Sequence, residues 1–280
     1  MLVLSYDINI FDSEHNPMGG LMYPTAASVA DFDRNLAHVR ARIEQARARS
    51  PFGQDVRLLP VSKTVPEERI RLAIEAGCGQ LGENKVQEAH RKWRSLADTP
   101  VSWSVIGHLQ TNKAKLVAEF ATEFQALDSL RVAETLDRRL QAAGRSLDVF
   151  VQVNTSAEDS KFGLAPGEVE AFVRQLPSYS ALRVRGLMTL AIFSTDTDRV
   201  RACFARLRTL RDQLRQSAPD GVGLDELSMG MSGDFELAIE EGASVVRVGQ
   251  AIFGARALPN DHYWPEPTNP GTSPGGAARI

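Results

Sequence analysis

The chain has 280 residues, of which 43% are hydrophobic, and a formal net charge of −3. A weakly acidic chain without a long basic run lacks the electrostatic footprint of a nucleic-acid-binding protein. Its two cysteines, Cys78 and Cys203, are too few for a disulfide scaffold or a thiolate metal site. Neither a membrane span of ~20 apolar residues nor a signal peptide is recognisable. We therefore expect a soluble cytoplasmic protein that binds neither nucleic acid nor membrane.

The first recognisable element is a helix that precedes a buried strand. Residues 1–24 show no periodicity, and we assign them to an irregular N-terminal extension. Apolar residues over 27–49 recur at helical spacing and predict a long amphipathic helix. The apolar run 56–63 then predicts a strand that ends at Lys63, and Pro66 suits the first turn of the next helix.

The same alternation of strand and helix continues along the chain. The predicted strands are 56–63, 80–84, 103–108, 124–128, 149–154, 184–190, 227–231 and 245–249, the last continuing into 251–254. The intervening helical patterns are 67–77, 86–96, 112–120, a helix capped by Ser129, 168–176, 200–214 and 235–241. Residues 258–280 are rich in Pro and Gly, which predicts a disordered C-terminal tail.

Eight strands that alternate with helices predict an α/β protein with one (β/α)8 TIM-type barrel over residues 25–257. The alternative is an open doubly wound sheet. That fold would need a glycine-rich phosphate-binding motif early in the chain, and neither G-x-G-x-x-G nor G-x-x-x-x-G-K-[ST] is present. The barrel is therefore favoured.

Polar side chains stand at the carboxyl ends of most predicted strands. They are Lys63, Asn84, His108, Asp128, Asn154, Thr189, Ser228 to Ser232, and Arg247 to Gln250. In a barrel these ends meet at one mouth, where side chains serve function. No H-E-x-x-H motif or His/Asp cluster indicates a metal site, and Met188, Met229 and Met231 are typical of barrel packing.

The segment 228–234 and the pair Gly249-Gln250 together predict a phosphate site. Segment 228–234 is rich in small and hydroxyl residues and opens a helix, and Gly230 and Gly233 let the backbone approach a ligand closely. Gly249-Gln250 supplies further backbone donors after the eighth strand. Barrels often hold phosphate between the loops after strands seven and eight.

A lysine beside a phosphate site suggests Schiff-base chemistry, because a buried lysine can lose its proton and attack a carbonyl. Two ligands fit this pair of features, pyridoxal phosphate (PLP) and the sugar phosphate of an aldolase. Arg247 favours PLP, because a guanidinium can donate to the pyridine nitrogen. It could equally pair with a carboxylate such as Asp128 or Glu226, and the residues alone leave both roles open.

Seven short motifs occur together in a recognisable order. They are Val61-Ser62-Lys63-Thr64, Leu81-Gly82-Glu83-Asn84, Ile106-Gly107-His108-Leu109-Gln110, Ser160-Lys161-Phe162-Gly163, Arg185-Gly186-Leu187-Met188, Leu227-Ser228-Met229-Gly230-Met231-Ser232 and Val246-Arg247-Val248-Gly249. With these motifs the chain resembles the pyridoxal phosphate homeostasis proteins, which look like the N-terminal barrel of alanine racemase. The resemblance runs from about residue 27 to 256.

This resemblance implies a PLP-binding site and a role for each residue in it. It implies a Schiff base on Lys63, a pyridine-nitrogen contact from Arg247, phosphate contacts from Ser232 and the Gly249-Gln250 backbone, and a pocket lined by Asn84, Ser228 and Met229. Gln250 departs from the small hydroxyl residue of some relatives, so only its backbone contact carries over. The implied function is a carrier or regulator of PLP and amino-acid pools, without established catalysis and with PLP-dependent apo-enzymes as recipients.

Two alternatives of another class remain at this stage. One is a PLP-dependent amino-acid racemase, although the ~24 residues after Arg256 are too few for the second domain that brings alanine racemase its tyrosine base. The other is a lysine aldolase on a sugar phosphate, which we rank last because strand six offers Met188 and Thr189 where such enzymes tend to place their lysine. We expect a monomer.

Overall fold

The computed structural model describes residues 23–156, 158 and 162–255. The expected N-terminal extension as far as residue 22 and the expected tail from 258 onward lie outside the described residues, and so do Ser160 and Lys161 of the fourth motif. The domain boundaries drawn from the sequence therefore remain predictions.

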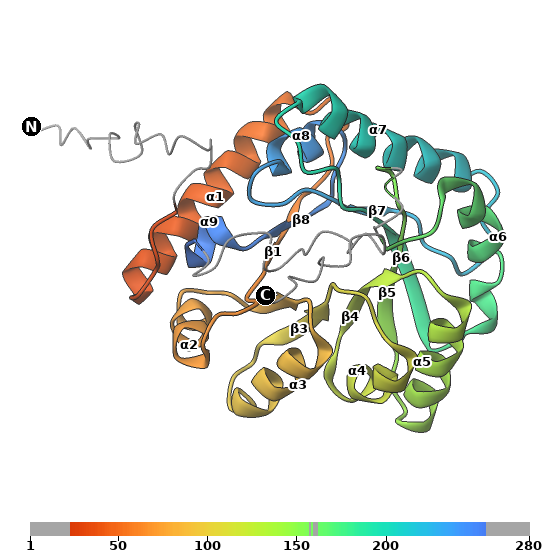
Figure 1. Cartoon of the computed structure of the whole chain (residues 1–280), viewed down its shortest axis with the longest axis horizontal. Helices are drawn as coiled ribbons and strands as arrows, with labels where there is room; N and C mark the ends of the chain where they lie inside the picture. Colours follow the sequence, from red (N-terminus) through yellow and green to blue (C-terminus); the bar gives the residue numbers. More distant parts are fainter. Residues whose placement is uncertain (1–22, 157, 159–161, 256–280) are drawn as a thin grey trace, which may run out of the picture.

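Eight parallel strands form the centre of the molecule (Figure 1). They are β1 (Arg57–Pro60), β2 (Gln80–Glu83), β3 (Ser102–Val105), β4 (Glu123–Leu127), β5 (Leu147–Gln152), β6 (Leu182–Met188), β7 (Glu226–Ser228) and β8 (Val245–Val248). They pair in the order β1-β8-β7-β6-β5-β4-β3-β2. A bridge between Val61 and Gly82 joins the two ends of this sheet. The predicted α/β barrel is confirmed.

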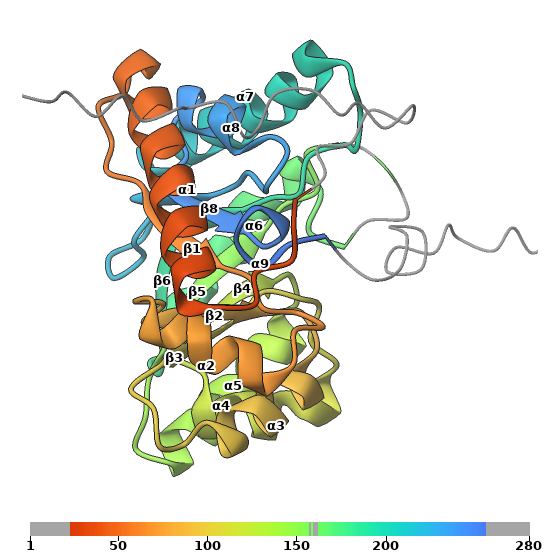
Figure 2. The ribbon, with the colours of Figure 1, turned by 90° about the vertical axis from the view of Figure 1, so that its left-hand side faces the viewer.

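Helices surround the strands. They are α1 (Val29–Arg49), α2 (Glu67–Glu75), α3 (Val86–Ser95), α4 (Ala114–Phe120), α5 (Leu130–Ala142), α6 (Val169–Val173), α7 (Thr197–Leu214), α8 (Phe235–Glu240) and α9 (Gln250–Phe253), with 3-10 turns at Thr111–Lys113, Pro166–Glu168 and Leu176–Ser178. Because α9 is short, the long α1 packs beside it and beside α8 (Figure 2). None of the helices in the described residues is long and apolar enough to cross a membrane.

The sequence of helix α1 explains where the helix begins and which face it buries. Ser28 caps it, and Asp31 completes a capping box. Phe32, Leu36, Val39 and Ile43 lie on one buried stripe. The ring of Phe32 packs edge-on against Phe253 of α9, with 5.5 Å between ring centroids. The helix therefore packs against α8 and α9, the helices on either side of β8 in the chain.

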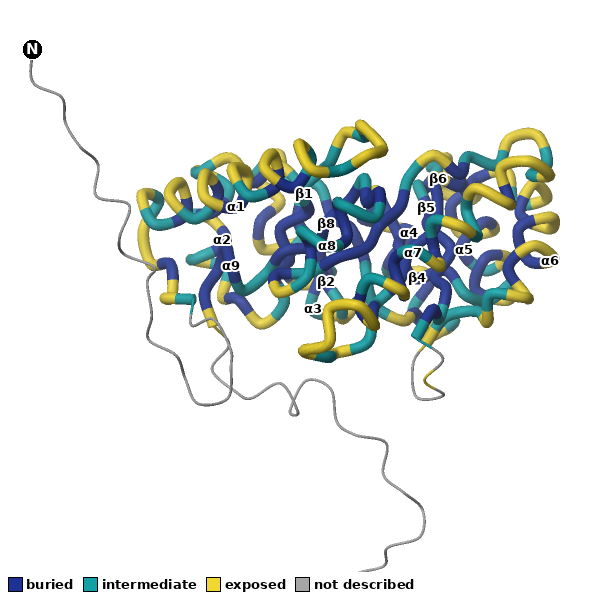
Figure 3. The backbone as a smooth tube through the Cα atoms, turned by 90° about the horizontal axis from the view of Figure 1, so that it is seen from above, coloured by how far each residue is buried: buried dark blue, intermediate teal, exposed yellow. Residues whose placement is uncertain are grey.

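The core occupies the barrel interior and the layer between strands and helices (Figure 3). All five residues of β4 are buried, as expected of a parallel strand that is covered on both faces. The helices bury one stripe each and leave their outer faces exposed. The strand backbones pair with one another around the sheet.

Several element ends differ from the sequence prediction. β1 ends at Pro60, so Lys63 lies in a turn beyond the strand rather than at its last residue. The predicted continuation of the eighth strand over 251–254 is wrong, because the Gly249 carbonyl accepts hydrogen bonds from Ile252 and Phe253 and starts helix α9. A short apolar run does not distinguish a buried strand from a buried helix. Ser129 does occupy the N-cap of α5, but its side chain makes no capping hydrogen bond.

Candidate cofactor site

Lys63 lies in the four-residue turn 62–65 directly after β1. The turn is closed by the Val65 N–H, which donates to the Ser62 carbonyl at 3.0 Å, and Lys63 itself is half-buried. Val61, which precedes this turn, is tied to β8, because its N–H donates to the Val248 carbonyl at 2.9 Å. A Cβ atom on Gly249 would lie 3.1 Å from the Val61 carbonyl oxygen. The lysine turn and the Gly249 turn are therefore adjacent.

Asn84 follows β2 on the other side of the lysine turn. The Ser62 N–H donates to the Gly82 carbonyl at 3.0 Å, which ties the two loops together. A Cβ atom on Gly107 would lie 2.2 Å from the Asn84 carbonyl oxygen, so only glycine fits there. The loops after β1, β2 and β3 thus meet at one end of the barrel, and Asn84 is half-buried among them.

Arg247 lies inside the barrel and is bound by neutral oxygens. Its side chain is 3% exposed, and its guanidinium donates to the Ser228 hydroxyl at 2.6 Å and to the Thr189 carbonyl at 2.7 Å. It does not pair with Asp128 or Glu226, the carboxylates considered from the sequence. Burial lowers the pKa of Arg247 to about 10, so the guanidinium stays protonated at neutral pH.

A chain of hydrogen bonds continues from Arg247 through the barrel interior. The Ser228 hydroxyl donates to Gln125 at 2.7 Å, and Gln125 donates to Glu123 at 2.7 Å. Glu123 also pairs with Arg57 at 2.6 Å. The sequence reasoning missed Gln125, although a signal was present. Residues 123 and 125 are polar at alternate positions of an otherwise apolar strand, which places both on one face.

The loops after β7 and β8 meet at Ser232. Its hydroxyl oxygen accepts from the N–H groups of Gly249 at 3.2 Å and Ala251 at 3.4 Å. The Tyr23 hydroxyl donates to its carbonyl at 3.4 Å, so a residue assigned to the N-terminal extension also reaches this loop. The two segments from which a phosphate site was predicted therefore lie together, and Gln250 begins helix α9 beside them.

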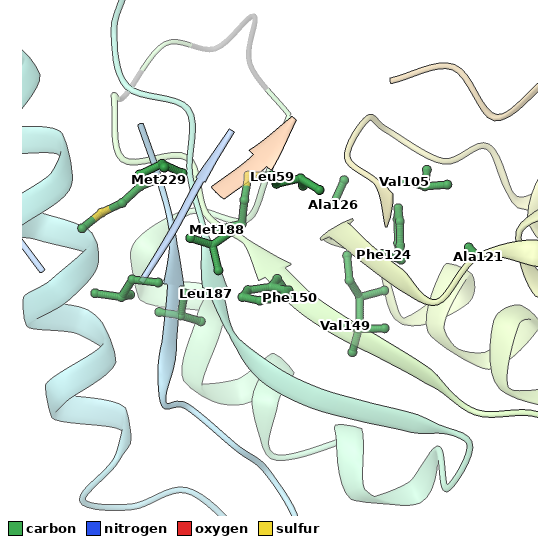
Figure 4. Close-up of a cluster of buried hydrophobic side chains, with 14 of the residues drawn as sticks. Leu59, Val105, Ala121, Phe124, Ala126, Val149, Phe150, Leu187, Met188 and Met229 are labelled. Carbon is green, nitrogen blue, oxygen red and sulfur yellow. The ribbon is translucent and has the colours of Figure 1, made fainter. Parts of the chain in front are cut away.

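Met229 and His108, two further residues from the sequence analysis, contact other parts of the barrel. Met229 is fully buried and packs in the hydrophobic core near Met188 (Figure 4), which favours the packing interpretation over a side-chain contact in the pocket. The ring of His108 stacks on Phe162, with 4.0 Å between ring centroids. Its Nδ1 atom lies 3.7 Å from Oδ2 of Asp128. Burial raises the pKa of Asp128, and the charge of His108 opposes that rise.

Comparison with known proteins places the chain in a family. The model of the alanine racemase N-terminal domain matches residues 34–257. The pyridoxal phosphate homeostasis protein of Pseudomonas aeruginosa is 44% identical over 226 residues, covering 79% of this chain and 94% of that protein. The Escherichia coli K12 protein of the same name is 40% identical over 239 residues, covering 81% and 97%. The chain belongs to the pyridoxal phosphate homeostasis protein family.

Solved structures agree with this membership. PipY of Synechococcus elongatus, solved with PLP bound, is 37% identical with a TM-score of 0.72, over 80% of this chain and 100% of that one. Alanine racemase from Streptomyces coelicolor, at 18% identity and a TM-score of 0.63 over 84% of this chain and 61% of that one, shares the fold. The resemblance drawn from the motifs is confirmed, and the family relatives are named homeostasis proteins rather than enzymes.

Proposed function

We propose that this homeostasis-family protein binds PLP as a Schiff base on Lys63 and acts as a carrier or regulator of PLP and amino-acid pools. The observation that carries the proposal is the meeting of three features at one barrel mouth. These are the Lys63 turn, the buried Arg247 and the Ser232 contact with Gly249. The relative PipY, solved with PLP bound, supports the choice of ligand.

Each residue has a defined part in this proposal. Lys63 would hold PLP covalently through its side-chain amine. Arg247 donates to the pyridine nitrogen, and Ser232 with the Gly249 and Gln250 backbone binds the phosphate. Asn84 and Ser228 line the pocket, and Met229 packs behind it in the hydrophobic core. The bound cofactor supplies an electrophilic aldehyde and a ring that can take up electron density.

The donors present suit this ligand. Arg247 is bound to a hydroxyl and a carbonyl, so no direct ion pair neutralises its charge, and it can only donate to an acceptor such as a ring nitrogen. The N–H groups of Gly249 and Ala251 converge on the small Ser232 hydroxyl. Backbone N–H groups and a hydroxyl gathered at one place can bind a phosphate, and their hydrogen bonds to its negative charge are strong. In the described residues, no group of three or more His, Cys, Asp or Glu could hold a metal.

The decisive experiment is borohydride reduction of the purified protein followed by peptide mass spectrometry. We expect a visible absorption band from the Schiff base and a pyridoxyl group fixed on Lys63, both lost in Lys63→Ala. Lys113→Ala is the control, since this lysine lies in the loop after β3, and it should retain both signals. An unchanged band in Lys63→Ala would refute the assignment.

Delivery to PLP-dependent apo-enzymes, a monomeric state and a cytoplasmic location are further parts of the proposal. Delivery can be measured by mixing the loaded protein with an apo-aminotransferase in the presence of a scavenger of free PLP. Activity that recovers despite the scavenger supports direct transfer. Light scattering of the purified protein tests the expected monomer.

A further inference from the structure

The turn that carries Lys63 has a strained backbone. Thr64, the residue after the lysine, has a φ of +67° and is the only non-glycine residue in the described part of the chain with a positive φ. A β-branched side chain rarely adopts this left-handed conformation, because it crowds its own backbone. Such a conformation persists where neighbouring contacts hold it.

A buried charge cluster lies directly behind this turn. Lys92 of α3 is fully buried, and its ammonium donates to the Ser62 carbonyl at 2.8 Å, to Glu83 at 2.7 Å and to Glu88 at 2.8 Å. These three contacts use all its donors. The helical spacing from Val86 and Ala89 would place an apolar residue at this position. A buried ammonium is costly unless it is paired, so its placement calls for a specific role.

Each member of the cluster also contacts the lysine turn. Glu88 accepts from the Thr64 N–H at 2.9 Å, and Glu83 accepts from the Ser62 hydroxyl at 2.7 Å. Lys92 donates to the Ser62 carbonyl, which belongs to the peptide group before Lys63, whereas the Thr64 N–H belongs to the peptide group after it. Both peptide groups that flank the Lys63 Cα are therefore fixed by the cluster.

We propose that Lys92, together with Glu83 and Glu88, is a positioning residue for Lys63. The cluster holds the left-handed turn and so fixes the direction in which the Lys63 amine enters the barrel mouth. This inference rests on the proposed function for the role of Lys63 itself. Attack on an aldehyde requires the amine to be held close to the carbon in the right orientation, so a relaxed turn should form the Schiff base more slowly and bind PLP more weakly.

The experiment compares four variants that separate positioning from stability. Lys92→Met removes the ammonium, and Glu88→Ala removes the acceptor of the Thr64 N–H. Glu88→Gln is the conservative variant, because its amide oxygen can still accept that hydrogen bond. Asp137→Ala is the matched control for lost stability. Asp137 is a buried acid that accepts from the Ala181 N–H at 2.8 Å, before the amino end of β6.

We expect Lys92→Met and Glu88→Ala to raise the dissociation constant for PLP about tenfold, because each removes one charge-assisted hydrogen bond to the backbone of the lysine turn. The rate of Schiff-base formation, followed by its absorption band, should fall in parallel. Glu88→Gln should remain within about threefold of the unmodified protein, and Asp137→Ala should lower the melting temperature without changing either PLP readout. Glu88 is partly exposed, so its variants should fold even if Lys92→Met does not.

Two results would overturn the inference, and they differ in what else they imply. If the unmodified protein forms no adduct on Lys63, the proposed function fails and this inference fails with it. If the unmodified protein forms the adduct and Glu88→Ala matches Asp137→Ala in affinity and rate, the positioning role is wrong and the proposed function stands.

Discussion

Ser232 joins three segments through one residue, because its hydroxyl receives two backbone N–H groups and its carbonyl receives the Tyr23 hydroxyl. In Ser232→Glu the added negative charge would face the PLP phosphate, and the hydroxyl would be lost. We expect weaker PLP binding by ~1–3 kcal/mol, measured by titration of the absorption band.

The phosphate dependence provides the control for this prediction. Unphosphorylated pyridoxal should bind the unmodified protein much more weakly than PLP, and Ser232→Glu should affect it less. Ser180→Glu, at an exposed position before β6, should leave both affinities unchanged. Equal affinity of the unmodified protein for pyridoxal and PLP would refute the proposed phosphate site.

At the scale of single residues, the sequence predicts which side chains lie at the barrel mouth better than it predicts their hydrogen-bond partners. The placement of Lys63, Asn84 and Arg247 at one mouth follows from their positions at strand ends. The partners of Arg247 do not, because Thr189 contributes a backbone carbonyl, which any residue type offers. The burial of Lys92 is also hidden in a single sequence, since a lysine in a helix is usually solvated.

Among the elements, the short link from β7 to α8 depends on a glycine that no other residue can replace without strain. Gly230 has a φ of +93°, and a Cβ there would lie 2.7 Å from the Ala238 Cβ and 2.8 Å from the Phe235 Cα. We expect Gly230→Ala to lower the free energy of unfolding by about 2–4 kcal/mol, from left-handed strain together with overpacking.

Gly233, three residues further along the same link, is the matched control. A Cβ at this position meets no atom within 4 Å, so Gly233→Ala should stay within about 0.5 kcal/mol. Both values can be measured by urea unfolding. Equal losses at the two glycines would contradict the structure of this link.

The elements themselves were largely predictable, and their ends were not. Apolar periodicity predicts all eight strands, because most strand residues are buried and helices separate the strands along the chain. The ends depend on turns that tertiary contacts impose. β1 stops before Lys63 because Ser62 pairs with Gly82 and Val65, and the run after Gly249 becomes helical in packing against α1.

For the whole molecule, the closed ring was predictable from the count of alternating elements, whereas its polar interior was not. The hydrogen bonds from Arg247 to Glu123 cross the barrel between strands that are far apart in sequence. Glu123 then meets Arg57 near the amino ends of the strands. A buried polar chain of this kind rigidifies a core when every member is paired, and it holds Arg247 at a fixed depth beneath the mouth.

This arrangement leads to a prediction about turnover. Racemisation requires a proton acceptor on each face of the substrate, and Lys63 would supply one. Of the tyrosines in the described residues, Tyr23 binds the Ser232 carbonyl and Tyr179 precedes β6 at the opposite end of the barrel. Arg247, protonated at neutral pH, would also keep the pyridine nitrogen unprotonated and the ring a weak electron acceptor. We therefore expect no loss of optical activity from L-alanine beyond that caused by free PLP at the same concentration, measured by polarimetry over many equivalents. Steady multiple turnover that disappears in Lys63→Ala would establish a racemase instead of a carrier.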